Sequence, residues 1–88
     1  MKEHVGKLFR TIDPMPTFGG YVDDKGFFVS ILPRQLLPNE MLVLVIGHVV
    51  DKQADSGGYR LGWVQMLTPR GIVWTGQLTF DAFCEEEE

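Results

Sequence analysis

The chain has 88 residues and a formal net charge of −4, and 44% of its residues are hydrophobic and 23% charged. This length gives one domain, because chains divide into several domains only beyond about 250 residues. The hydrophobic content excludes wholesale disorder. The charge is concentrated at the end of the chain: residues 85–88 are all glutamate, and the remainder holds eight acidic and eight basic residues. We expect one domain over residues 1–84 and an acidic tail over 85–88, solvated and mobile because like charges repel.

The neutral body argues against non-specific nucleic-acid binding, whose affinity comes from Lys and Arg side chains neutralising phosphates. Cys84 is the only cysteine, so no internal disulfide can form, and no Cys/His cluster has zinc-ligand spacing. We therefore expect no metal and no cofactor. Residues 1–10 lack an apolar core of signal-peptide length, and the apolar run 41–50 is shorter than the ~20 residues that span a bilayer. The sequence predicts a soluble, cytoplasmic protein with no membrane partner.

The first half of the chain predicts strands separated by tight turns. Residues 5–12 form the first expected strand, which ends where Pro14 and Pro16 remove backbone donors. Residues 23–26 read Asp-Asp-Lys-Gly, a turn with glycine at its fourth position, and residues 27–32 follow as another strand.

The middle of the chain combines a proline-bracketed segment with its most hydrophobic strand. Residues 33–38 begin and end with proline and are too short for an α-helix, so we expect a 3₁₀ turn or a hook there. Residues 41–51 form a strand that is either buried on both faces or bent at Gly47. Residues 52–58 are polar and predict a loop.

The segment from residue 59 to residue 76 predicts a β-hairpin. Two runs rich in β-branched and aromatic residues flank the sequence Thr68-Pro-Arg-Gly71, in which proline sets φ and glycine accepts a left-handed conformation. Apolar residues nowhere recur at helical spacing over more than two turns. The fold class is therefore all-β, with five or six strongly bent antiparallel strands.

Three parts of the chain carry a family resemblance: Val5–Arg10, the aliphatic strand 42–50, and the hairpin 63–83 with its short finish. They resemble the SH3-like barrel, and within it the uncharacterised small proteins common in bacteriophages of marine bacteria. The resemblance implies a closed barrel with a short 3₁₀ turn near the C-terminus, which often self-associates or acts inside a larger assembly. For a phage-encoded chain it implies a place in the host cytoplasm or the virion.

The chain departs from the better-known SH3 domains that bind proline-rich peptides. Their early Ala-Leu-Tyr-Asp-Tyr-like motif has no counterpart, because residues 12–15 read Ile-Asp-Pro-Met, and no proline precedes the finish at residues 77–80. We therefore do not expect recognition of proline-rich peptides.

Five residues are candidates for a binding surface. Trp63, Tyr59 and Phe80 could form an aromatic ligand patch at the barrel mouth, although such rings also fill or cap cores. Leu36 and Leu37 lie on a short segment between prolines, where they either pack back over the barrel or form an exposed apolar patch of the kind found at interfaces.

The remaining polar residues do not indicate catalysis. His48 lies within the most apolar strand, where a structural role is expected. Asp23 and Asp24 fit the turn that contains them, and Cys84 has no histidine near it in sequence. No phosphate-binding loop, serine elbow or zinc-protease motif is present.

These observations leave two hypotheses from different classes. The first is a non-enzymatic structural or protein-interaction module that binds a protein partner or itself, such as a subunit of a phage-related assembly. The alternative is a barrel that binds single-stranded nucleic acid, with Trp63 and Tyr59 stacking on bases and Lys7, Arg60 and Arg70 along one face.

Overall fold

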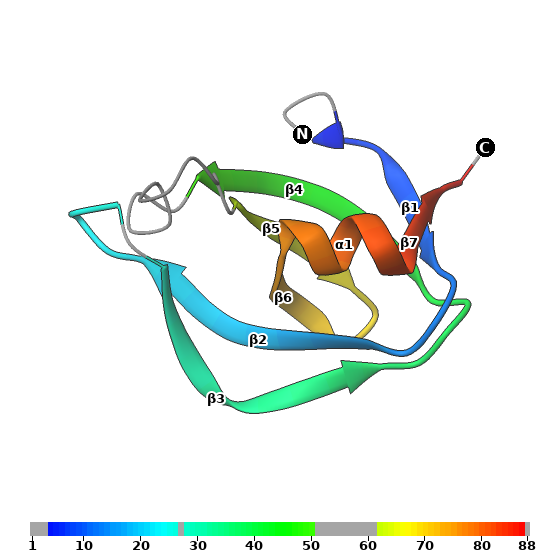
Figure 1. The fold of residues 1–88 in the computed structure, drawn as a ribbon, viewed down its shortest axis with the longest axis horizontal. Coiled ribbons are helices and arrows are strands. Elements are labelled where there is room, and N and C mark those ends of the chain that lie inside the picture. Colours follow the sequence, from blue (N-terminus) through cyan, green and yellow to red (C-terminus); the bar gives the residue numbers. More distant parts are fainter. Residues whose placement is uncertain (1–3, 27, 51–61, 88) are drawn as a thin grey trace.

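The computed structural model describes residues 4–26, 28–50 and 62–87 of the chain. This part forms seven strands and one short helix, which Figure 1 shows in chain order. The elements are β1 (Leu8–Thr11), β2 (Met15–Val22), β3 (Phe28–Leu37), β4 (Leu42–Val50), β5 (Gly62–Thr68), β6 (Gly71–Gly76), α1 (Gln77–Phe83) and β7 (Cys84–Glu86). The all-β prediction is confirmed, whereas the expected strand number was too small.

All strand pairings in the described residues are antiparallel, and the strands lie in the order β3-β2-β6-β5-β4-β1-β7. The sheet is strongly bent but not closed, because β3 and β7 are its two edges. The closed barrel expected from the sequence is therefore not what the structure has. In the sheet, the β2–β3 hairpin pairs with β6 at one position, Phe18 opposite Trp74, and it forms a separate arm in Figure 1.

The predicted β5–β6 hairpin is confirmed. Its register runs from Trp63 opposite Gly76 to Thr68 opposite Gly71. Gly71 has φ +108°, a conformation that favours glycine. The Thr68 hydroxyl accepts a hydrogen bond from the Arg70 amide at 3.1 Å and donates one to the Gly71 carbonyl at 2.9 Å. The turn residues therefore determine the register of this hairpin by local chemistry.

The segment 33–38 is not a hook or a 3₁₀ turn. Its residues up to Leu37 continue β3, and Leu36 and Leu37 pair with Pro16 and Met15 of β2. The strand alternation exposes 57% of Leu36 and buries Leu37 completely. Burial of Leu37 in the core explains why a strand persists here despite the flanking prolines.

The expected 3₁₀ turn near the C-terminus is an α-helix, α1. Its seven residues contain neither proline nor glycine. Tertiary packing stabilises so short a helix, which could not form alone in water. Its Phe80 is 1% exposed and packs edge to face on Phe9, with ring centroids 4.9 Å apart.

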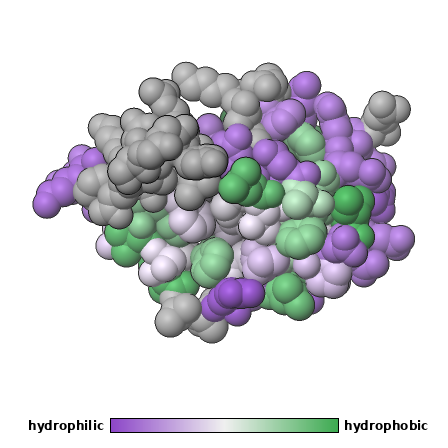
Figure 2. All heavy atoms as spheres, in the orientation of Figure 1, coloured by the Kyte–Doolittle hydropathy of each residue, from purple (hydrophilic) through white to green (hydrophobic). Residues whose placement is uncertain are grey.

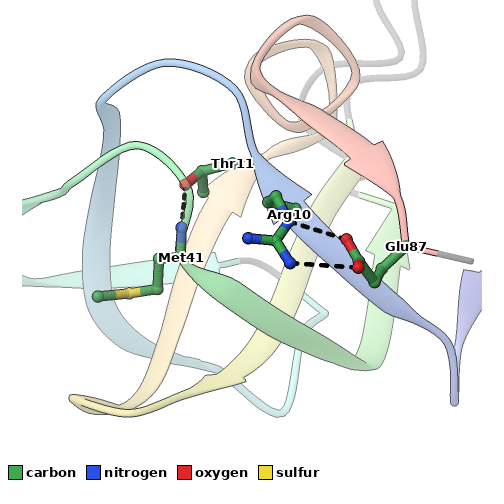
Figure 3. Close-up of polar contacts among 4 residues, drawn as sticks. All are labelled: Arg10, Thr11, Met41 and Glu87. Atoms are coloured by element: carbon green, nitrogen blue, oxygen red, sulfur yellow. Dashed lines mark hydrogen bonds and ion pairs between the residues drawn. The ribbon is translucent and has the colours of Figure 1, made fainter.

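The acidic run is not a free tail as far as Glu87. Cys84–Glu86 form β7, which pairs with β1. Two basic residues of the N-terminal region offset the repulsion between the glutamates. Arg10 binds Glu87 through two hydrogen bonds, of 2.8 and 3.2 Å (Figure 3), and the Lys7 ammonium lies 3.5 Å from the Glu86 carboxylate.

One hydrophobic core fills the inside of the bent sheet. Its buried members are Phe9, Met15, Leu37, Val43, Val45, Val64, Met66, Val73 and Phe80. Thr11 is also fully buried, and its hydroxyl donates to the Pro38 carbonyl at 2.8 Å and accepts from the Met41 amide at 2.9 Å (Figure 3). These bonds satisfy the buried hydroxyl and tie β1 to the turn between β3 and β4.

Candidate interaction surface

An aromatic cluster lies on the outer face of the β5–β6 hairpin, opposite the core. Val64 and Val73 point inward, so the alternation of the strands turns Trp63 and Trp74 outward. Phe28 stacks on Trp63 with ring centroids 4.1 Å apart, and the ring of Phe18 meets Trp63 edge to face at 6.1 Å. We call Phe18, Phe28, Trp63 and Trp74 the aromatic cluster.

The β2–β3 hairpin covers the Trp74 end of this cluster. Trp74 is only 5% exposed, and its indole Nε1 donates a hydrogen bond to the Gly20 carbonyl at 3.1 Å. Gly20 allows β2 to lie close to β3 and to the Phe28 ring: a Cβ there would lie 2.4 Å from the Val29 carbonyl oxygen and 2.7 Å from the Phe28 ring. The hairpin therefore depends on a glycine to hold Phe28 in the cluster.

The Trp63 end of the cluster opens into a groove. The groove has a volume of about 230 Å³ and lies where β5 begins and α1 begins, lined by Gly62, Trp63, Gly76, Gln77, Leu78 and Thr79. Leu78 is 67% exposed beside it. We call this the Trp63 groove. Figure 2 shows the side of the molecule that carries α1, where hydrophobic residues form small patches separated by hydrophilic ones.

A hydrogen bond holds the first residue of α1 against β4. His48 Nε2 and Gln77 Oε1 lie 3.0 Å apart, and the bond passes over Gly62. A Cβ at Gly62 would lie 2.4 Å from His48 Nε2 and 2.6 Å from Gln77 Oε1. The absence of a side chain at residue 62 thus allows the bond that positions one wall of the groove. His48 has the structural role expected from the sequence.

A second hollow, of about 210 Å³, lies between the β2–β3 hairpin and β6. Phe18, Ile31 and Ile72 supply apolar walls, and Gln35 and Arg70 supply polar ones. It opens where the pairing of β2 with β3 shifts register after Thr17.

The structure divides the five residues predicted for a binding surface. Trp63 lines the groove, and Leu36 is exposed on the edge strand β3. Phe80 and Leu37 are 1% and 0% exposed and belong to the core, so neither is accessible to a ligand. Tyr59 lies outside the described residues.

Sequence reasoning missed Gly62, Gln77 and Leu78 as residues of the groove. These residues meet only because α1 docks at the start of β5. A glycine within a strand often marks a place where another part of the chain approaches closely. Gly62, directly before Trp63, could have been selected on that ground.

The basic residues proposed for nucleic-acid binding do not gather in the described part of the chain. Lys7 forms an ion pair with Glu86 of the edge strand β7. Arg70 lies in the β5–β6 turn, and β4 separates β5 from β1 in the sheet. Arg60 lies outside the described residues.

The thiol of Cys84 is not an activated nucleophile. Burial raises its pKa to about 12, and the Asp81 carboxylate contributes in the same direction. Among residues 4–26, 28–50 and 62–87, no three His, Cys, Asp or Glu side chains gather as a metal-binding group. In the same ranges, no helix has the length and hydrophobicity needed to cross a membrane.

Comparison with known proteins gives no relative: no protein-family model, curated protein or solved structure matches this chain. The function must therefore be inferred from the groove and the sheet themselves.

Proposed function

We propose that this chain is a non-enzymatic protein-interaction module with an SH3-like fold, and that it binds an apolar side chain of a protein partner in the Trp63 groove. The resemblance to small phage proteins gives the proposal its most specific form, a subunit of a phage-related assembly.

The order of elements supports the SH3-like assignment. A first strand, a long central strand with a register shift next to Gly47, and a hairpin with a glycine turn follow one another as the resemblance implies. A short α-helix stands where the resemblance implies a 3₁₀ turn, and the strand β7 follows it. The β2–β3 hairpin stands between the first strand and the central one as an additional arm.

The observation that carries the binding proposal is a large exposed leucine beside an oriented tryptophan. Leu78 is 67% exposed next to Trp63, whose ring is held by Phe28 and Phe18. A ring that is already ordered loses little side-chain entropy on binding, and tryptophan is enriched among the residues that dominate interface energies. The hydrogen bond between His48 and Gln77 also orders the wall of the Trp63 groove that α1 forms.

A peptide-display experiment tests the proposal. Random peptides are selected against the folded protein, and the affinity of a selected peptide is compared for the wild type, Leu78→Asp and Leu36→Asp. Leu36 is the matched control, because it is a leucine of similar exposure located on β3. We expect Leu78→Asp to weaken binding by at least about tenfold, because it places a charge against an apolar contact, and Leu36→Asp to leave it unchanged.

The Trp63 indole N–H resonance should also shift when the peptide binds. Failure to select any peptide, or equal affinity for the wild type and Leu78→Asp, would contradict the proposal.

A further inference from the structure

Four aliphatic side chains form a row across the outer face of the sheet. Pairing places Leu8 opposite Leu44, Leu44 opposite Leu67, and Leu67 opposite Ile72. Directly paired residues share a face, with Cβ atoms about 4.5–5.5 Å apart. We call these four residues the aliphatic row.

The aliphatic row faces away from the core. The residues that follow Leu8 and precede Leu67, Phe9 and Met66, are buried core members. Leu8, Leu67 and Ile72 themselves are 46%, 45% and 56% exposed. Such a continuous apolar strip on an outer sheet face is of the kind that marks an interaction site.

Opposite charges stand at the two ends of the aliphatic row. Arg70 lies in the turn next to Ile72. At the other end, the Glu87 amide donates to the Leu8 carbonyl at 2.9 Å. Glu85 lies directly opposite Arg10 in the pairing of β7 with β1, on the outer face. Within the described ranges neither Arg70 nor Glu85 forms an ion pair.

We propose that the aliphatic row is the contact through which two copies of this chain form a symmetric dimer. The sheets pack face to face about a two-fold axis parallel to the strands. Ile72 of each copy then lies over the partner copy's first strand, at Leu8, and Leu67 lies over the partner's Leu44. A self-complementary patch of this kind is what a two-fold interface requires.

The charges select this axis over its alternative. Leu42 pairs with Arg10, and Arg10 with Glu85, so these residues lie at one level along the strands. That level lies two residues further along the strands than the pair Leu44–Leu67, in the direction of the β5–β6 turn. The turn that contains Arg70 is therefore at the same level as Glu85. An axis parallel to the strands therefore brings Arg70 of one copy to Glu85 of the other, twice. An axis along the row would instead carry this level of the partner to the opposite side of the row, so that Arg70 of one copy and Glu85 of the other would not meet.

The composition of the patch is that of a small interface between two copies. A standard interface buries about 800 Å² on each partner, with an apolar centre and a polar rim. The row and its exposed neighbour Leu42 supply the centre, and the charged ends supply the rim. We expect a dissociation constant on the order of 1–10 µM. The dimer goes beyond the proposed function, because the row and the Trp63 groove lie at opposite ends of the β5–β6 hairpin.

Sedimentation equilibrium of the full chain, over about 1 to 500 µM, tests the dimer. We expect the wild type to dimerise and Leu67→Asp to raise the dissociation constant at least about 100-fold, since a buried unpaired charge opposes association. Leu78→Asp is the matched control, which should dimerise as the wild type does. Circular dichroism checks that each variant is folded, and Ile72→Asp replaces Leu67→Asp if the latter is not. A wild type that stays monomeric, or a dimer that survives the row variant, overturns the proposal.

A charge exchange tests the arrangement of the two copies. Arg70→Glu and Glu85→Arg each place like charges together at two symmetric sites, and each should weaken the dimer about tenfold. The double variant restores both pairs, so its dissociation constant should return to within about threefold of the wild type. Failure of the double variant to recover overturns this arrangement. Peptide binding in the Trp63 groove should be the same for all these variants, so the dimer and the groove can fail independently.

Discussion

The two faces of the β5–β6 hairpin use different chemistry. The inner face presents Val64, Met66 and Val73 to a core that five other strands and α1 also enclose. The outer face carries Trp63 and Trp74, which the β2–β3 hairpin covers with the rings of Phe18 and Phe28. Aliphatic packing from many directions should stabilise the whole domain, whereas the aromatic cluster should stabilise chiefly the β2–β3 hairpin.

The largest effect is expected in the inner core, at Phe80. Phe80→Ala removes a fully buried ring that packs on Phe9, and should lower the free energy of unfolding by about 3–5 kcal/mol in urea denaturation. Leu78→Ala on the same helix is the control, with an expected change within about 0.5 kcal/mol because Leu78 is exposed. A loss below about 1 kcal/mol for Phe80→Ala would mean that α1 does not close the core.

The second effect should be confined to the outer side of the hairpin. Gly20→Ala places a Cβ against the Val29 carbonyl and the Phe28 ring, and should cost about 2–3 kcal/mol. Hydrogen exchange should accelerate in β2 and β3 and remain slow in β4 and β5. Gly19→Ala is the matched control, since its Cβ would lie at an ordinary 3.5 Å from the Ile31 carbonyl oxygen. Equal acceleration in all strands would show that the two faces unfold as one unit.

A smaller effect is expected at Gly62, which lies beneath the hydrogen bond between His48 of β4 and Gln77 of α1. Gly62→Ala displaces the ends of the His48 and Gln77 side chains, which can move, so we expect a cost of about 1 kcal/mol. In a Gln77→Ala background the cost should shrink, because one of the two displaced atoms is gone. Gly76→Ala serves as the control, since its nearest neighbour would be the Thr79 hydroxyl at 3.9 Å. A cost at Gly62 that is unchanged by Gln77→Ala would remove the bond from this explanation.

The difference between local and long-range contacts explains which features could be predicted from the sequence. The β5–β6 hairpin follows from local turn chemistry at Thr68–Gly71. A bend at Gly47 is one of the two alternatives that the sequence leaves for the central strand, and the pairing of β4 with β5 shifts register between Val45 and Gly47. The strand at Glu85 and Glu86 could not be foreseen, because it depends on basic residues far away in sequence. Arg10 and Glu87, which clamp it, are 77 positions apart. A run of glutamates predicts a mobile tail only when no strand with basic side chains pairs with it.

The candidate site shows the same limit. Trp63 could be selected because tryptophan on a strand is rarely fully buried. Leu36 and Leu37 could not be separated by composition: only the register of β3 against β2 decides that one is exposed and the other buried. Leu78 became a candidate only when α1 placed it beside Trp63.

The smallest effect concerns the pH dependence contributed by the C-terminal strand. The hydrogen bonds from Arg10 hold the pKa of the Glu87 carboxyl below its usual range, and the positive charge of Arg10 acts in the same direction. In the unfolded chain this carboxyl titrates near about 4.3. The stabilisation is therefore present at neutral pH and is lost as the pH falls below about 4 and through the folded pKa. Glu87→Gln should have a slightly lower melting temperature than the wild type at pH 7, and the difference should vanish in acid and shrink at high salt. Asp24→Asn, which changes a carboxylate to an amide at an exposed turn residue, is the matched control and is measured under the same conditions. If the difference between the wild type and Glu87→Gln were the same at pH 7 and pH 3, the ionised pair would not be what holds the edge strand β7 in place.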